Sequence, residues 1–252
     1  MAAQDHPSFR RPRDPGAKIW RYMSCAKFEW MLRTASLYFH RADSFKDPLE
    51  GHYTSANPSM EDAWISHQIA NFGFGARPGS EEELRAAYRR MLDVVHADKM
   101  ETFVNCWHMS ARESLSMWKE YAADNTAVCI QSTFQSLHHV LPEQCFLGGV
   151  RYIDYATDFI DPIISVSFIS HKDIAFSRER EIRSVIWGKQ AVHAFKPVGP
   201  SGLEVPINLT SLIEVIRVSP NAADHYEDTI RALGSSYGLR APVGRSVFSG
   251  SA

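Results

Sequence analysis

A charged pair inside an apolar stretch offers the clearest chemistry in the sequence. The segment Phe176–Trp187 reads FSREREIRSVIW, and from Glu181 onward charged and apolar residues alternate. In a strand, this alternation puts Glu181 and Arg183 on one face and Ile182 on the other. A carboxylate beside a guanidinium is either a surface salt bridge or a catalytic carboxylate with the residue that orients it. The catalytic interpretation requires further functional residues elsewhere in the chain.

Aromatic residues and an arginine offer ligand contacts of the kind such a site needs. Arg21 lies in the aromatic run IWRYM, where a cation needs an anionic partner or a head that reaches solvent. Trp118 and Tyr121 share one face of a predicted helix, so they either stack on a planar ligand or pack in the core. His108, next to Trp107, is a candidate acid, with a hydrogen-bonded interior histidine as the alternative.

The segment KDPLEGHY carries three potential metal ligands. Asp47, Glu50 and His52 have side chains that can bind a cation, but the Asp47–Pro48 pair and Gly51 are equally typical of a tight turn. The turn explains the spacing without further ligands. We therefore predict no metal site here.

The elements that must position these residues alternate irregularly along the chain. The predicted strands are Ile19–Met23, Leu37–His40, Phe103–His108, Ala127–Gln131, Gly149–Ile153, Glu181–Trp187, Leu203–Asn208 and Ile213–Val218. The predicted helices follow Ser24 and Pro220 and also cover Met60–Phe72, Ser80 to about Met100, Glu113–Ala122 and the stretch around Phe134–His138. This order predicts a single α+β domain over residues 17–252, with helices packed around a mixed or antiparallel sheet. Residues 1–16, which are polar and contain three prolines, are expected to form a flexible tail with few contacts.

Composition limits the classes of function. The chain has 252 residues and a net charge of -2, so its overall charge gives no attraction to nucleic acid or anionic lipid. The four cysteines are widely spaced and show no metal-binding pattern, which predicts free thiols and a cytoplasmic location. No stretch has the length of a membrane span, and the N-terminus lacks the apolar segment of a signal peptide.

Several short motifs together resemble a known family. The runs LYFHRADSFKDPLEG, FVNCWHMSARESLSMWKEYA, AVCIQSTF, VRYIDY, FSREREIR and IEVIRVSP contain the motifs DPxEG, MWxxY and ExExR. From about Ile19 to its last residues, the chain is similar to a widespread bacterial family known as domain of unknown function twenty-nine seventy-one. The resemblance names no activity. It implies that the polar motif residues form one site, namely Arg21, Asp47, Glu50, Trp118, Tyr121, Glu181 and Arg183.

The order of the residues is also similar to that of ADP-ribosyltransferases, by analogy. Those enzymes use an early Arg or His, a central Ser or Tyr, and a Glu that is often part of a Glu-x-Glu pair. Here the corresponding residues are Arg21, then Ser110 or Tyr121, then Glu179 and Glu181. The analogy implies NAD as the substrate and a nucleotide-like ligand.

The same analogy implies a role for each residue. The expected catalytic residues are Glu181, Glu179 and Tyr121, and the expected cofactor-binding residues are Arg21, Trp118, Ser110 and Arg183. Arg21 would bind the pyrophosphate, and Tyr121 would stack on the nicotinamide. Glu181 would stabilise the cationic sugar, and Glu179 would take the proton of a protein or RNA acceptor. The biological role that goes with such an enzyme is that of a toxin or an antiviral defence effector.

Two other functions remain open at this point. A nuclease would use Asp47, Glu50 and Glu181 to bind Mg²⁺, with Arg183 and Lys172 on phosphate. A non-catalytic ligand sensor would keep the same pocket without chemistry. Both alternatives keep Glu181 in a site, and incubation with NAD and with RNA, with and without EDTA, distinguishes them from the transferase.

Overall fold

The structure is a computed structural model that describes residues 2–45, 47–71, 81–122 and 125–250. Within these residues, the strands of the main sheet are β1 (Lys18–Met23), β2 (Ser36–Arg41), β3 (Thr102–Met109), β4 (Val128–Thr133), β5 (Phe146–Gly149), β8 (Glu181–Trp187), β9 (Lys196–Val198), β10 (Gly202–Pro206), β11 (Val215–Val218) and β12 (Val243–Arg245). A separate two-stranded parallel sheet pairs β6 (Arg151–Ile153) with β7 (His171–Asp173). The pairings of the main sheet are antiparallel except between β11 and β12, so the sheet is mixed.

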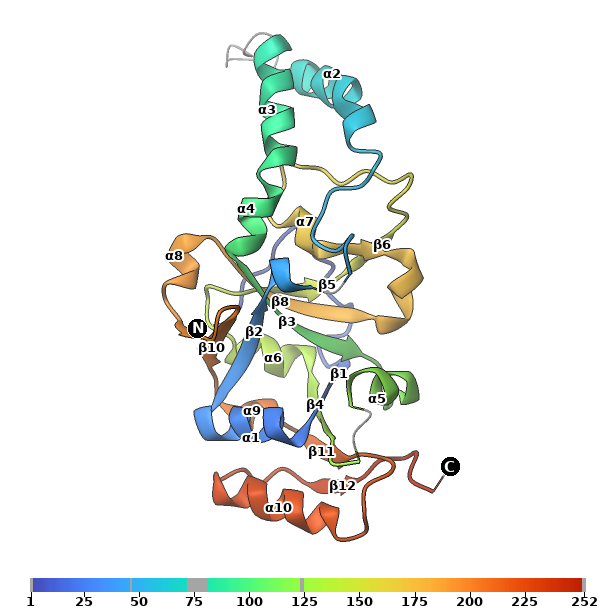
Figure 1. Cartoon of the computed structure of the whole chain (residues 1–252), viewed down its shortest axis with the longest axis vertical. Coiled ribbons are helices and arrows are strands. Elements are labelled where there is room, and N and C mark those ends of the chain that lie inside the picture. The colour runs from blue at the N-terminus through green and yellow to red at the C-terminus, as the bar shows by residue number, and fades with distance from the viewer. Residues whose placement is uncertain (1, 46, 72–80, 123–124, 251–252) are drawn as a thin grey trace.

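Helices surround the main sheet. The α-helices are α1 (Cys25–Thr34), α2 (Glu61–Asn71), α3 (Glu81–Asp93), α4 (Val95–Met100), α5 (Leu115–Tyr121), α6 (Phe134–Val140), α7 (Ser167–Ser170), α8 (Lys189–Val192), α9 (Leu209–Leu212) and α10 (Tyr226–Ser236). The short 3-10 helices are η1 (Ala42–Ser44), η2 (Pro58–Met60) and η3 (Ile174–Glu179). Figure 1 shows α2 and α3 projecting from one end of the molecule and α10 covering the other. The predicted single α+β domain is confirmed; Phe72 and Ser80, two of the predicted helix ends, lie outside the described residues.

Strand β3 organises the part of the sheet that carries the charged pair. Along one edge, β3 pairs with β8 from Thr102 to His108, and His108 lies opposite Glu181. The other edge is shared: β1 pairs with the end of β3 at His108, and β2 pairs with its beginning at Val104. The strand that carries Glu181 is therefore an interior strand, between β3 and β5.

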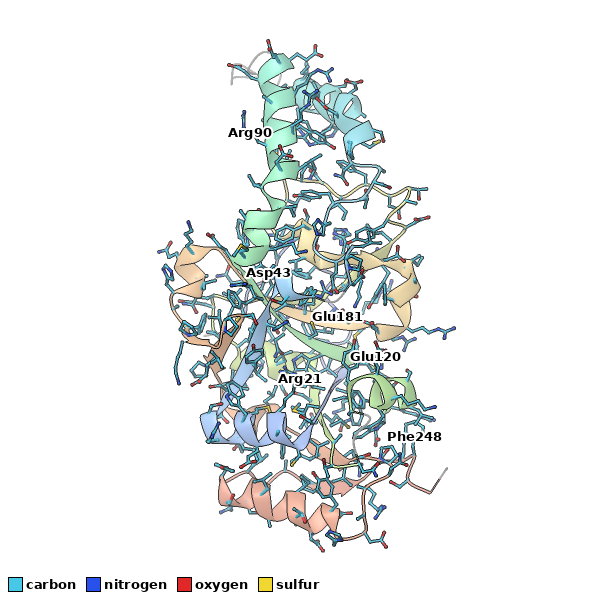
Figure 2. All side chains as sticks on the ribbon, in the orientation of Figure 1. Arg21, Asp43, Arg90, Glu120, Glu181 and Phe248 are labelled. Atoms are coloured by element: carbon cyan, nitrogen blue, oxygen red, sulfur yellow. The ribbon has the colours of Figure 1, made fainter. Side chains whose placement is uncertain are left out.

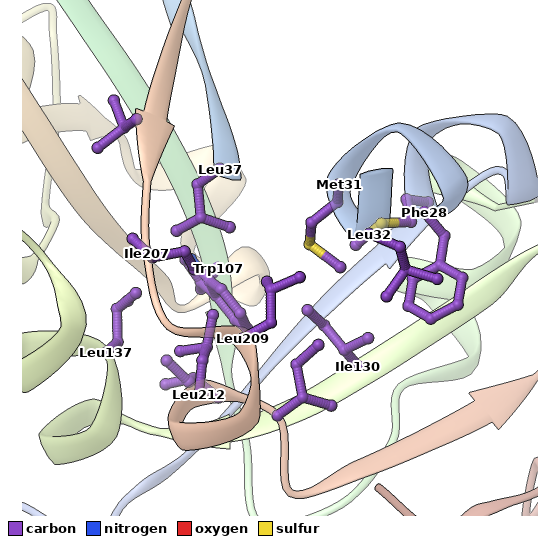
Figure 3. Packing of buried hydrophobic residues seen from close by; sticks show 14 of the residues in the cluster. Phe28, Met31, Leu32, Leu37, Trp107, Ile130, Leu137, Ile207, Leu209 and Leu212 are labelled. Carbon is purple, nitrogen blue, oxygen red and sulfur yellow. The ribbon is translucent and has the colours of Figure 1, made fainter. Parts of the chain in front are cut away.

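Alternate residues of β8 belong to different hydrophobic clusters, which shows the side of the sheet that each residue faces. Ile182 and Ile186 belong to the largest hydrophobic cluster, together with Trp107 and residues of α1, α6 and α9 (Figure 3). Val185 belongs to a second cluster on the other face, with Val104. Alternate residues of β8 thus face opposite sides, as the sequence pattern predicts.

The N-terminal segment differs from the prediction. Ala3 and Phe9 are buried, and Gln4 and Arg10 form backbone bridges to β5. The prediction that residues 1–16 make few contacts is wrong for the described part of this segment. The physical reason is that β5 leaves one edge open to this segment, and Phe9 packs against Gly148 of β5 and joins the second hydrophobic cluster.

Two smaller predictions concern the cysteines and membranes. All four cysteines are free thiols, as predicted. Among the described helices, none has both the length and the apolarity that crossing a bilayer requires.

Candidate functional site

Arg183 lies at the centre of a buried group of ions. Its side chain has no exposed surface, and its Nε and Nη2 donate to the two carboxylate oxygens of Glu181 at 2.8 and 3.0 Å. Nη2 also donates to Glu50, and Nη1 donates to the carbonyl oxygen of Ile169 at 2.7 Å. The guanidinium carbon lies 5.6 Å from the centre of the Phe45 ring. The predicted pairing of Glu181 with Arg183 is present, but it is buried, so the surface salt bridge is excluded.

Lys172 lies near three carboxylates, two of which also contact Arg183. Its Nζ lies 2.6 Å from Glu179, 3.4 Å from Glu181 and 3.9 Å from Glu50. We call the five residues Glu50, Lys172, Glu179, Glu181 and Arg183 the ion cluster. With all five ionised, three carboxylates face two cations, which leaves one net negative charge.

A tight turn brings Glu50 into the ion cluster. The Asp47 carboxylate accepts the backbone N–H of Leu49 at 2.9 Å, and Gly51 takes a φ of +74°, which an L side chain rarely adopts. Lys99 donates to the carbonyl oxygen of Glu50 at 3.0 Å and holds the turn in place. The DPLEG segment is therefore a turn, as predicted, and it delivers a carboxylate to Arg183.

The geometry does not favour a metal at this place. Glu50 contacts Arg183 and Lys172, and His52 lies 3.0 Å from Lys99. In the part of the chain that the structure describes, no group of three or more His, Cys, Asp or Glu residues could hold a metal ion. Ammonium and guanidinium groups contact the Glu50 and Glu181 carboxylates, which a Mg²⁺ site would need as ligands.

The backbone around Glu181 is fixed by local contacts. The backbone N–H of Glu181 donates to the hydroxyl oxygen of Tyr152 at 2.9 Å, and the thiol of Cys106, which lies opposite Arg183 in β3, lowers the pKa of the Glu181 carboxyl group. Just before it, Arg180 takes a left-handed φ of +42°, which ends η3 and turns the chain into β8. Only 7% of the Glu181 side chain is exposed.

Burial dominates the electrostatics of Glu181. An adjacent cation lowers the pKa of a carboxyl group, and on that basis Arg183 would keep Glu181 strongly acidic. The net direction is the opposite: burial raises the pKa of the Glu181 carboxyl, and the opposing effects of Lys172 and the Cys106 thiol are smaller. Burial likewise lowers the pKa of Arg183 to about 9, so the guanidinium stays charged at neutral pH.

Arg21 is separated from Glu181 by the pleat of the sheet. Trp20 lies opposite His108, which lies opposite Glu181, so Trp20 rather than Arg21 shares the Glu181 face. Arg21 Nη2 donates to the carbonyl oxygen of Tyr38 at 3.4 Å, and burial lowers its pKa to about 10. The register therefore does not support a common pocket for Arg21 and Glu181, although both appear on the body of the molecule in Figure 2.

The two aromatic candidates on α5 have different environments. Trp118 is buried against Tyr22, and its indole N–H donates to Glu113 at 3.1 Å. Trp118 therefore packs in the core, which is one of the two alternatives given for it from the sequence. Tyr121 is 47% exposed. Partial burial, and after it the negative charge of Glu179, raises the pKa of the Tyr121 hydroxyl. Of the two, only Tyr121 has surface that a ligand can contact near the ion cluster.

Ser110 and His108 have local structural partners. The Ser110 hydroxyl accepts the backbone N–H of Arg112 at 3.3 Å, and its carbonyl oxygen accepts the indole N–H of Trp20 at 2.8 Å. His108 Nδ1 lies 2.6 Å from the carbonyl oxygen of Glu179, which makes Nδ1 the protonated nitrogen. His108 is thus a hydrogen-bonded interior histidine that fixes the backbone before Glu181.

Two cavities lie away from these residues. One of about 290 Å³ is lined by Asp5, His6, Pro7, Phe9, Arg11 and Leu147. The other, of about 280 Å³, is lined by Ile216, Arg231, Gly234, Ser235, Leu239, Arg240, Ala241, Pro242 and Val243. Neither includes a predicted site residue, so a pocket at the ion cluster stays a prediction.

Comparisons with known proteins give remote similarities. No family model and no curated protein matches the chain, so the family resemblance of the motifs stays a prediction. A structure of Thermus sp. 2.9 DarT with carba-NAD⁺ aligns at 10% identity and a TM-score of 0.36, covering 94% of this chain and 97% of that chain. A structure of Thermus sp. 2.9 DarT with ADP-ribosylated single-stranded DNA aligns at 12% identity and a TM-score of 0.38, covering 93% of this chain and 96% of that chain. A structure of the same protein with NAD⁺ aligns at 9% identity and a TM-score of 0.37, covering 93% of this chain and 98% of that chain. Similarity at this level does not decide the function of the chain.

Proposed function

We propose that the chain is an NAD-using enzyme of ADP-ribosyltransferase type, acting as a transferase or a glycohydrolase. The observation that carries the proposal is the ion cluster. It holds Glu181 in one orientation with two cations, places Glu179 beside it on the same ammonium, and carries one net negative charge when all five groups are ionised. A fixed carboxylate with an unbalanced negative charge stabilises a cation that forms next to it.

Cleavage of NAD creates such a cation. The bond between ribose C1′ and the nicotinamide nitrogen breaks, its electron pair stays on the nicotinamide nitrogen, and positive charge develops on the ribose. Glu181 would stabilise that charge more in the transition state than in the bound substrate, which is the condition for a faster reaction. Water or an acceptor hydroxyl then forms the new bond to C1′, and Glu179 takes its proton.

Tyr121 and Glu179 suggest the direction from which the ligand arrives. Tyr121 is 47% exposed and Glu179 retains 13% of its side-chain surface, more than the 7% of Glu181. We place the nicotinamide against the Tyr121 ring, with the ribose turned toward Glu181. A toxic or antiviral role would follow from this reaction, because loss of NAD or modification of an acceptor harms a cell.

The test is release of nicotinamide from NAD by the purified chain. We expect turnover by the wild type, and a loss of about 10²-fold or more for Glu181→Gln, because the substitution deletes a charge that acts in the transition state. Glu227→Gln is the matched control, since Glu227 forms a 2.6 Å ion pair with Arg231 on α10, away from the ion cluster. Its activity should equal that of the wild type.

Three results separate the alternatives. RNA cleavage that EDTA abolishes, without nicotinamide release, would establish the nuclease. Calorimetric binding of NAD without turnover would establish a ligand sensor. Full activity of Glu181→Gln, at an unchanged melting temperature, would remove Glu181 from the chemistry.

A further inference from the structure

We propose that Lys172 is a positioning residue that holds the carboxylates of Glu179 and Glu181 together as one catalytic pair. The inference rests on the proposed function for its catalytic consequence. Its structural part concerns only the arrangement of three side chains. Lys172 comes from β7, in the small second sheet, so a separate part of the fold supplies it.

The contacts of Glu179 depend on Lys172. Among the described residues, Lys172 is the one side chain that forms a hydrogen bond or ion pair with the Glu179 carboxylate, at 2.6 Å. Arg183 forms its ion pairs with Glu181 and Glu50, and not with Glu179. Lys172 is therefore the link between the half of the ion cluster that contains Glu179 and the half that contains Arg183.

The surroundings of Lys172 fix its ammonium in place. Only 7% of its side chain is exposed, and its Nζ lies 5.0 Å from the centre of the Phe176 ring. Two carboxylates that share one ammonium can approach each other without the repulsion that like charges otherwise produce. Burial lowers the pKa of Lys172, but the charges of Glu181 and Glu179 outweigh it, so the pKa is raised and the ammonium persists at neutral pH.

The position of Lys172 also explains why a lysine suits it. An ammonium group has three donors on a compact centre, and Lys172 has three carboxylate neighbours, Glu179, Glu181 and Glu50. Loss of the ammonium would leave Glu179 free to turn toward solvent. The proton acceptor would then be displaced from the ribose that Glu181 contacts.

The first experiment follows catalysis in Lys172→Met, Lys172→Gln and Lys172→Arg. With NAD as substrate, we expect the Met and Gln variants to lose about 10²-fold in kcat with little change in KM, because a displaced catalytic group slows the reaction rather than binding. The acidic limb of the pH profile should also move upward, since removing an adjacent cation favours protonated Glu181. Lys172→Arg, which keeps the charge but not the compact ammonium, should recover part of the activity. The control is Lys196→Met, which removes a 3.2 Å ion pair between Lys196 and Glu204. The side chain of Lys196 is 72% exposed.

The second experiment is independent of catalysis. The carboxyl carbon of Glu181, labelled with ¹³C and identified by its absence in Glu181→Gln, is titrated by NMR in each folded variant. We expect its midpoint to move upward in Lys172→Met and Lys172→Gln and to return in Lys172→Arg.

The outcomes of the two experiments are distinguishable. An unchanged NMR midpoint in the Met and Gln variants overturns the proposal whatever the activity. A shifted midpoint in a wild type that never releases nicotinamide supports the arrangement and refutes the proposed function. An effect on KM alone, or no recovery in Lys172→Arg, assigns Lys172 a merely structural role.

Discussion

Replacing Arg183 with methionine should destabilise the protein far more than removing a surface arginine. Methionine fills much of the space of the arginine stem but leaves Glu181 and Glu50 without their shared cation, and Ile169 O without its donor. Removing one partner of a buried ion pair costs about 3–5 kcal/mol, because the other charge stays buried and uncompensated. At about 2–4 °C per kcal/mol for a domain of this size, the melting temperature should fall by about 6–20 °C.

The loss should depend on pH in one direction. Without Arg183, the pKa of Glu181 in the folded protein, which burial already raises, rises further above that of the unfolded chain. A carboxyl group of this kind binds its proton more tightly when folded, so its destabilising effect grows as the pH rises above the ordinary glutamate pKa of about 4.3. The difference in melting temperature between Arg183→Met and wild type should therefore be larger at pH 8 than at pH 5.

Differential scanning calorimetry at the two pH values checks both expectations. Arg231→Met is the matched control, because Arg231 is 49% exposed and forms a 2.6 Å bond to Glu227. An exposed pair contributes less than about 1 kcal/mol, so this variant should lose under about 4 °C at either pH. If Arg183→Met loses no more than the control, or loses the same at both pH values, the account of a buried and unbalanced ion cluster is refuted.

Three further predictions concern other parts of the chain. Glu179→Gln should keep NAD binding, measured by calorimetry, and should reduce transfer to an acceptor more than hydrolysis; an equal loss of both would contradict a proton-accepting role. Phe9→Ala should cost about 3 kcal/mol in urea unfolding, because it empties a buried aromatic site under the N-terminal segment, and an unchanged midpoint would show that this segment adds no stability. Trp118→Phe should cost about 1–3 kcal/mol, because it removes the 3.1 Å hydrogen bond to the buried carboxylate of Glu113; added NAD should bind the variant as it binds the wild type, and weaker binding would return Trp118 to the site.

The sequence predicts best where one periodic pattern decides the outcome. Alternation in β8 correctly places Glu181 and Arg183 on one face and Ile182 on the other, because strand geometry leaves no other choice once a strand forms. The Asp–Pro and Gly signals likewise predict the turn that holds Glu50. Both features follow from local backbone preferences, which a single sequence displays.

The sequence predicts poorly what depends on register between distant strands. Arg21 and Glu181 are 160 positions apart, and a shift of one residue in the pairing of β1 with β3 would exchange the face of Arg21 with that of Trp20. The contacts of Lys172 depend on β7, which joins the main body through a separate small sheet. Nothing in the segment SHKDIA indicates that its lysine is buried among carboxylates.

The burial of the ion cluster bears on whether it exists for stability alone. A buried ion pair is weak support for stability, since well-packed apolar residues of similar volume often stabilise a protein as much or more. Here three carboxylates surround two cations in the ion cluster. When all five groups are ionised, one buried negative charge has no balancing cation within the cluster, and its burial costs free energy of desolvation. Apolar side chains in place of the charged ones would not carry that cost. Other positions of β8 are occupied by such residues, namely Val and Ile. The unbalanced charge is explained if a positive charge joins the cluster during function, and a ribose that becomes cationic next to Glu181 would supply it. A positively charged ligand that binds without reacting would supply it as well, and for that reason turnover of NAD and not binding alone decides the proposal.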